Sequence, residues 1–325
     1  MTSVRLARMA MASRFELVLQ GEHETWLRAA GEQALAEIAR LDRQLSIYSP
    51  ASEVSRINAR AADGPVSVEP RLFELLRTAK LYSEESNGAF DITVAPLMRA
   101  WGFFRGSGKF PDEDALQRAR DVTGMHLVHL DESDRTIRFE KKGVLLDLGA
   151  IGKGYAVDEA ILVLREAGVE RAFLHGGTST SYGLGTPIDG DRWQIAIPYP
   201  GEESSSDEES VLAVAPLENT SLSVSAVWGK AFEVEGITYG HVLDARAGLP
   251  VDGAVLTAVV ADSATEADAL STALLVQGRE CSDLLGLLRD RICALVLFPS
   301  DDAVGFESID HRFRTLPSSR QTESS

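Results

Sequence analysis

A glycine-rich stretch around a lysine is the first part of the sequence whose residue types could bind a ligand. The stretch LLDLGAIGKGYAVDEA, residues 145–160, runs from apolar residues through glycines flanking Lys153 into a predicted helix. Its spacing matches neither the Walker A loop, Gly-x4-Gly-Lys-Ser/Thr, nor the dinucleotide fingerprint, G-x-G-x-x-G. A helix N-terminus near Gly154 would still offer N–H groups to an anion, with Lys153 as a cation beside them. The alternative is a tight strand-to-helix turn that carries a surface lysine.

A second stretch, ATEADALSTALLV, could bind a metal ion. Asp268 and Thr272 are four residues apart and therefore share one face of a predicted helix. A carboxylate and a hydroxyl there would offer two oxygen ligands to a hard cation such as Mg²⁺. The competing interpretation is a capping box, in which Thr265 caps the helix and Asp268 follows three residues later. Spacing alone favours the cap.

Two further residues could take part in chemistry. His241, in GHVLDARAG, stands at the end of a predicted hairpin, where it could act as a general base or contact a metal or phosphate. A lone histidine is more often structural. Asp91, in GAFDITVAP, is a carboxylate in an apolar segment, which is costly unless it is hydrogen-bonded or paired. It could contact a ligand or cap a turn, and the sequence does not separate the two.

Composition limits the classes of partner. The chain has 325 residues, 44% hydrophobic, and a formal net charge of −17. Such a charge repels nucleic acid and anionic membrane surfaces, so a phosphate compound would have to be bound locally by backbone N–H groups, a few cations or a metal. The chain has two cysteines, and we find no apolar run of transmembrane length and no signal-peptide pattern. We therefore expect a cytoplasmic protein without a transmembrane segment.

Hydrophobic periodicity predicts an α+β fold, because strands and helices are mixed without strict alternation. We expect one domain over residues 1–316, an acidic serine-rich surface loop at about 201–210 and a disordered tail at 317–325. Hairpins are predicted to turn at Lys142-Gly143 and at Glu235-Gly236. Other predicted strands lie at 15–19, 171–177, 193–200, 211–217, 254–261 and 293–298, and helices at 27–45, 70–86, 154–167 and 265–276.

Taken in order, these blocks resemble the ApbE family of FAD:protein FMN transferases. The similar blocks run from about residue 11 to 278, and the most specific are Asp-Leu-Gly-x-Ile-x-Lys-Gly and Ala-Asp-Ala-Leu-x-Thr. The others are MASRFELV, LSIYSPASEVSRIN, GAFDITVAPLMRAWGF, HGG and GHVLDARAGLPV. The resemblance implies an ApbE-like fold, with mixed or antiparallel sheets flanked by helices and an FAD and Mg²⁺ site in a cleft.

The resemblance also implies an activity. Members move the FMN half of FAD onto a threonine or serine of an acceptor flavoprotein, release AMP and require Mg²⁺. His241 is then the candidate for removing the acceptor's proton, and the metal would be held by Asp268, Thr272 and the Ala150 carbonyl. An FAD hydrolase and a non-catalytic flavin-binding protein are the alternatives. The residues that would contact FAD are Met11, Tyr48, Ala89, Phe90, Asp91, Asp147, Lys153 and Val242.

Some positions depart from the family pattern. Thr178 follows Gly-Gly, where the family usually has an acidic residue. In the block DARAG, Ala245 and Ala247 replace a proline and a threonine, and SVSAVW replaces Thr-Ser-Gly before an aromatic position. We expect these changes to affect substrate preference and, to a lesser degree, activity. The metal and lysine blocks are intact.

Overall fold

The architecture is taken from a computed structural model, which describes residues 1–199, 211–288, 290–298, 305–308 and 313–315. The predicted acidic loop at 201–210 and the predicted tail at 317–325 lie outside the described residues. The single-domain boundary at residue 316 therefore stays a prediction.

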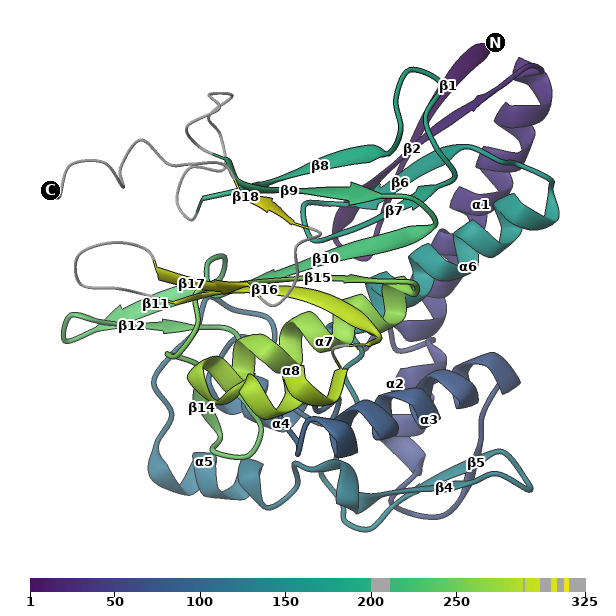
Figure 1. Ribbon diagram of the computed structural model, residues 1–325. Helices are drawn as coiled ribbons and strands as arrows, with labels where there is room; N and C mark the ends of the chain where they lie inside the picture. Colours follow the sequence, from purple (N-terminus) through teal and green to yellow (C-terminus); the bar gives the residue numbers. More distant parts are fainter. Residues whose placement is uncertain (200–210, 289, 299–304, 309–312, 316–325) are drawn as a thin grey trace, which may run out of the picture.

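An eight-stranded sheet forms the centre of the fold (Figure 1). The strands follow the order β1-β2-β6-β7-β10-β15-β16-β17, and every pairing described is antiparallel. This confirms an α+β architecture with antiparallel sheets. The bounds are β1 Thr2–Ala10, β2 Ser13–Gly21, β6 Ala172–Gly176, β7 Thr180–Leu184, β10 Thr220–Ala226, β15 Leu256–Ala261, β16 Ile292–Phe298 and β17 Gly305–Ser308.

Three helices cover one face of this sheet: α1 (Glu24–Leu45), α6 (Gly152–Glu166) and α7 (Ala264–Gln277) (Figure 1). The other face packs against a small sheet of β8 (Trp193–Pro198), β9 (Val211–Leu217) and β18 (Arg314–Thr315). Strand β15 is buried along its whole length because it is covered on both sides. Its side chains alternate, as the pleat requires, between the helix-side core and the core under the small sheet.

The remaining elements form a second part of the molecule, drawn below the sheet in Figure 1. An aromatic cluster of Trp101, Phe103, Phe232 and Tyr239 packs the β11–β12 hairpin onto the region after α4, which positions the residues that follow β12. The bounds here are α2 Glu53–Arg60, α3 Pro70–Glu85, α4 Ala95–Ala100, α5 Glu113–Arg120, α8 Ser282–Leu288, β3 Val66–Ser67, β4 Val128–Asp131, β5 Thr136–Phe139, β11 Ala231–Val234, β12 Ile237–Gly240, β13 Leu243–Asp244, β14 Leu249–Pro250 and the 3-10 helices Met125–Leu127 and Gly278–Glu280.

One predicted hairpin is wrong. The chain does turn at Lys142-Gly143, but residues 144–148 form no strand. Strand β5 instead pairs with β4, which precedes it, and with β3. The apolar residues after the turn are buried in the core as an extended segment, so the alternation suggested a strand where tertiary packing alone buries the side chains. The hairpin that turns at Glu235-Gly236 is confirmed as β11–β12.

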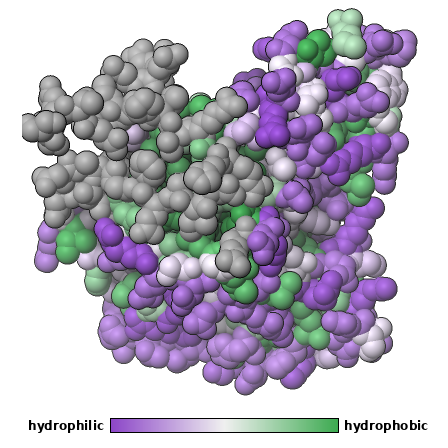
Figure 2. Space-filling model, in the orientation of Figure 1, coloured by the Kyte–Doolittle hydropathy of each residue, from purple (hydrophilic) through white to green (hydrophobic). Residues whose placement is uncertain are grey.

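No helix in the described part of the chain is long and apolar enough to cross a membrane. In the view of Figure 2, the surface over α3, α5 and β4–β5 is mostly hydrophilic, with single apolar residues among polar ones. This face therefore shows the ordinary mixture of a water-exposed surface.

Candidate functional site

Helices α6 and α7 cap one another with carboxylates. Asp268, on α7 and only 4% exposed, accepts a hydrogen bond of 2.9 Å from the N–H of Gly154, in the first turn of α6. Asp158, on α6, accepts bonds of 2.8 and 2.9 Å from the N–H groups of Ala264 and Thr265, at the start of α7. Each carboxylate thus satisfies N–H groups that the other helix leaves unpaired.

This arrangement corrects the predicted capping box of Thr265 and Asp268. The N-cap of α7 is Ser263, whose hydroxyl accepts a bond of 3.3 Å from the N–H of Glu266. Asp268 does cap a helix, but the helix is α6, and sequence spacing could not reveal a partner 114 residues away. Asp158 was missed as well, since nothing local distinguishes it from an ordinary helix carboxylate.

The hydrogen bonds to the second oxygen of Asp268 are long. Oδ1 accepts from Ser223 Oγ at 3.2 Å and from Thr180 Oγ1 at 3.4 Å, beyond the usual range for hydroxyl donors. The Ser223 hydroxyl also lies 3.1 Å from the carbonyl of Ser179, so its one proton is shared. This buried oxygen is therefore only weakly satisfied by the protein and can accept a further partner.

Thr272 lies on the same helix face as Asp268, as its spacing predicts. Its hydroxyl donates to the Asp268 carbonyl at 3.3 Å and lies 3.3 Å from Ser225 Oγ, which in turn is 2.8 Å from Ser271 Oγ. The region around Asp268 is consequently rich in hydroxyl oxygens. Most come from the segments HGGTSTSYG and SVSAVW.

Gly154 has a packing role. A Cβ at this position would lie 2.1 Å from the carbonyl oxygen of Ala264 and 2.8 Å from Cβ of Asp268. The glycine therefore permits the close contact of two helices, and its N–H is already bound to Asp268. This N–H is therefore not available to an incoming anion, and the prediction that the helix N-terminus near Gly154 offers N–H groups to an anion stays a prediction for the neighbouring N–H groups. Lys153, the preceding residue, donates a hydrogen bond to Ser179 Oγ.

Asp147 lies beside two of the other segments predicted to contact FAD. Its N–H donates to the carbonyl of Ile92 at 2.7 Å, directly after the segment 89–91. Burial raises the pKa of the Asp147 carboxyl, and the N–H of Gly149, 2.9 Å away, opposes this. Burial and the negative charge of Asp147 both raise the pKa of Tyr48, so the two side chains act on each other. Tyr48 is 48% exposed and packs on Phe104.

The side chain of Asp91 is used within the protein. Its oxygens accept bonds of 2.7 Å from the N–H of Thr93, 2.5 Å from the Thr93 hydroxyl and 3.0 Å from the N–H of Met125. Burial raises the pKa of Asp91 against these bonds. Of the two roles left open by the sequence, the turn cap is the one observed. Ala89 and Phe90 are buried, so a ligand could meet this segment mainly through its backbone.

His241 is partly buried just after β12. Its Nδ1 lies 3.2 Å from the carbonyl of Lys230, which assigns the proton to Nδ1 and leaves Nε2 as an acceptor. Burial lowers the pKa of His241, the hydrogen bond with the Lys230 carbonyl opposes this, and the charges of Lys230 and Lys153 lower the pKa further. The ring is therefore neutral at pH 7, as a general base must be. Val242 follows it and packs against the main core.

Met11 lies in the two-residue turn between β1 and β2. Met11 and Ala12 have positive φ angles of 49° and 55°. The hairpin is held to the end of β6 by a bond of 3.0 Å from the N–H of Gly177 to the carbonyl of Arg14. The turn is thus close to Gly177, two residues before Ser179, the partner of Lys153.

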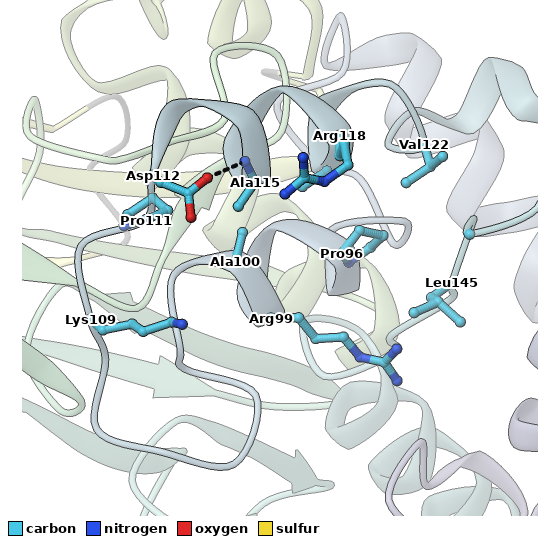
Figure 3. Close-up of a pocket in the computed structure, with 12 residues that line it drawn as sticks. Pro96, Arg99, Ala100, Lys109, Pro111, Asp112, Ala115, Arg118, Val122 and Leu145 are labelled. Carbon is cyan, nitrogen blue, oxygen red and sulfur yellow. Dashed lines mark hydrogen bonds between the residues drawn. The ribbon is translucent and has the colours of Figure 1, made fainter.

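A cavity of about 370 Å³ lies between α4 and α5, beside residues 143–145 (Figure 3). The carboxylate of Asp112 on its wall caps α5 through the N–H of Ala115 at 2.7 Å. None of its lining residues is among the predicted site residues, so the cleft expected for FAD stays a prediction. The lining residues are Pro96, Arg99, Ala100, Lys109, Pro111, Asp112, Ala115, Arg118, Ala119, Val122, Gly143 and Leu145.

The donor set around Asp268 fits a hard cation. One oxygen of a buried carboxylate is weakly satisfied, and Thr272 adds a hydroxyl from the next turn. The described residues contain no group of three or more His, Cys, Asp or Glu side chains that could hold a metal. Mg²⁺ suits such a sparse site, because it keeps waters and binds through one or two carboxylates plus substrate phosphates. Ala150, whose carbonyl was the third predicted ligand, lies two residues before α6 begins.

Comparison with known proteins identifies the family. The model of the ApbE family matches residues 11–295. The chain belongs to the ApbE family. Among curated relatives, the FAD:protein FMN transferase of Vibrio cholerae serotype O1 is 32% identical over 243 residues, covering 73% of this chain and 70% of its own. That of Treponema pallidum is 28% identical over 305 residues, covering 89% and 83%.

Solved structures of ApbE proteins share the fold. The crystal structure of the ApbE protein from Thermotoga maritima has a TM-score of 0.84 at 26% identity and covers 94% of this chain and 97% of its own. The apo form of the Pseudomonas stutzeri flavinyl transferase ApbE has a TM-score of 0.81 at 28% identity and covers 94% of each chain. The ApbE-like fold predicted from the sequence is therefore confirmed.

Proposed function

We propose that this protein is a Mg²⁺-dependent FAD:protein FMN transferase. It would move FMN from FAD to a threonine or serine hydroxyl of an acceptor flavoprotein, forming a phosphoester bond and releasing AMP. Family membership and the printed names of the relatives support the reaction class. The observation that carries the proposal is the α6–α7 junction. There the weakly satisfied carboxylate of Asp268 accepts a hydrogen bond from the N–H of Gly154, the residue that follows Lys153.

The residues of the site divide the chemistry among them. Lys153 supplies a cation for the pyrophosphate, and His241, neutral with Nε2 as acceptor, can take the proton of the attacking hydroxyl. Asp268 and Thr272, with the Ala150 carbonyl, would hold Mg²⁺, which when bound neutralises charge on the phosphate oxygens. Tyr48, the 89–91 segment, Asp147, Val242 and Met11 would contact the rest of FAD. We also propose a cytoplasmic location, on the sequence pattern given above.

The test uses purified protein, FAD, Mg²⁺ and flavoproteins that contain candidate acceptor segments. We expect AMP release and a mass gain on the acceptor equal to one FMN phosphoester, with both signals lost when EDTA replaces Mg²⁺. FMN and AMP formed as fast without an acceptor would instead identify an FAD hydrolase. Tight FAD binding without turnover would identify a non-catalytic flavin-binding protein.

A further inference from the structure

The partner of the Lys153 ammonium is a neutral hydroxyl. Lys153 donates to Ser179 Oγ, and among the residues that the structure describes it has no carboxylate within ion-pair distance. A carboxylate partner would cancel the charge of the lysine for any incoming anion, whereas a hydroxyl holds the ammonium and leaves its charge in place. In a chain with a net charge of −17, such a cation is a specific local feature.

Ser179 is itself held by three further contacts, one through its hydroxyl and two through its carbonyl. Its hydroxyl donates to the carbonyl of Gly176 at 3.5 Å, a long contact that leaves an oxygen lone pair facing Lys153. Its carbonyl accepts from the N–H of Val224 at 2.7 Å and from Ser223 Oγ at 3.1 Å. The turn between β6 and β7 is thereby attached to β10. Ser179 therefore presents its hydroxyl from a turn that is hydrogen-bonded to the sheet and not from a free loop.

The same contacts connect Lys153 to Asp268. Ser223 Oγ reaches both the Ser179 carbonyl and Oδ1 of Asp268, while Gly154, next to Lys153, donates to Oδ2 of Asp268. A cation and a weakly satisfied carboxylate are thus held at one helix start by one network. The charge of Lys153 also reaches His241, whose pKa it lowers.

We propose that Ser179 is a positioning residue that holds the Lys153 ammonium as an uncompensated cation for the pyrophosphate group of the ligand. The identity of that ligand as FAD rests on the proposed function, but the positioning role does not. Replacing the hydroxyl by a carboxylate would keep a partner for Lys153 and remove its net charge. Removing the hydroxyl, which leaves the methyl side chain of alanine, would keep the charge of Lys153 and release the ammonium from its fixed position.

The experiment measures equilibrium binding of inorganic pyrophosphate, FAD and riboflavin, without Mg²⁺, to variants whose folding is checked by thermal unfolding. For Ser179→Asp we expect pyrophosphate and FAD to bind more weakly by roughly tenfold or more, and for Ser179→Ala by a few-fold to tenfold. Ser179→Thr retains the hydroxyl and should bind like the wild type. Riboflavin, which has no phosphate, should bind all of these proteins equally.

Leu162→Asp is the matched control, because it adds the same charge at an exposed residue of α6, the helix that carries Lys153. Its effect on pyrophosphate binding should be much smaller than that of Ser179→Asp. In a Lys153→Gln background, Ser179→Ala should have no further effect. Equal pyrophosphate binding by wild type and Ser179→Asp, or an equal loss of riboflavin binding, overturns the positioning role. Pyrophosphate binding with the expected pattern but no FMN transfer would remove the proposed function and leave this inference standing.

Discussion

Asp158 and Asp268 offer a comparison within one junction, since each carboxylate caps the start of the other's helix. Asp158 is saturated: its oxygens accept bonds of 2.6 to 2.9 Å from two N–H groups and two hydroxyls at the start of α7. Asp268 has one bond of this quality, from Gly154, and two hydroxyl contacts of 3.2 and 3.4 Å. The two aspartates occupy reciprocal positions, but the hydrogen bonding of the Asp158 carboxylate is complete and that of the Asp268 carboxylate is not.

The difference separates a structural carboxylate from a candidate ligand. Losing short hydrogen bonds from amides that have no other partner costs stability, so the Asp158 carboxylate is not free to bind a further ligand. The hydroxyl groups that make these long contacts can rotate toward another acceptor at little cost. Oδ1 of Asp268 can therefore bind a cation while its surroundings stay folded. Asp91 belongs with Asp158, because its bonds of 2.5 to 3.0 Å occupy both oxygens.

Asp268→Asn should give the largest effect on activity. The amide keeps one oxygen for the N–H of Gly154 but removes the charge that would hold Mg²⁺, so we expect FMN transfer to fall by roughly 1,000-fold. Stability should fall by only about 1 kcal/mol. Steady-state kinetics over a Mg²⁺ titration, with thermal unfolding alongside, would measure both. Asp158→Asn is the matched control, and an unchanged Mg²⁺ requirement in Asp268→Asn would return Asp268 to a purely capping role.

His241→Gln should give the next largest effect, a fall in kcat of roughly 100-fold with little change in FAD binding. The pH profile of the wild type provides an independent check. Because burial and two lysine charges lower the pKa of His241, the neutral ring persists below the ordinary value of 6.5 and is lost only as the pH falls further. We therefore expect the acid limb of kcat/KM below pH 6.5. A limb above that value, or one that His241→Gln leaves in place, would assign proton removal to another group.

The fold was largely readable from the sequence, and the junction was not. The sequence pattern located α1, α3, α6 and α7: α1 and α3 each bury one apolar face, whereas α7 is a mostly apolar run that is buried on nearly all sides. Strand β10, TSLSVSA, was not predicted, because its alternate residues Ser221, Ser223 and Ser225 are hydroxyl side chains in place of an apolar row, and Ser223 contacts Asp268. The four-residue spacing placed Asp268 and Thr272 on one helix face, but only the tertiary structure shows that Asp268 caps α6 and that Asp158 caps α7.

Gly154→Ala tests whether the two caps depend on one close contact. The added methyl would meet the Ala264 carbonyl at 2.1 Å, against backbone that cannot turn aside, so the helices must separate. We expect a loss of about 2 to 3 kcal/mol in the free energy of unfolding. Chemical denaturation would measure it. Gly152→Ala is the control, since its added methyl, in the same turn, would lie 3.8 Å from the nearest side-chain atoms, an ordinary van der Waals contact. Equal stability of the two variants would mean that the junction is loosely packed.

Asp158→Asn should have the smallest effect on FMN transfer, and it tests the other member of the pair. The amide can still accept from one of its partners, but its NH₂ group would face donors at the start of α7, so we expect a loss of about 1 kcal/mol in the free energy of unfolding. FMN transfer per folded molecule should stay within about threefold, because the caps on α6 and the hydroxyls around Asp268 are untouched. Asp262→Asn, which removes an exposed charge beside the same helix start, is the control for electrostatics alone. A fall in activity as large as that of Asp268→Asn, at intact stability, would show that the saturated carboxylate also serves the chemistry, and the distinction between the two caps would then fail.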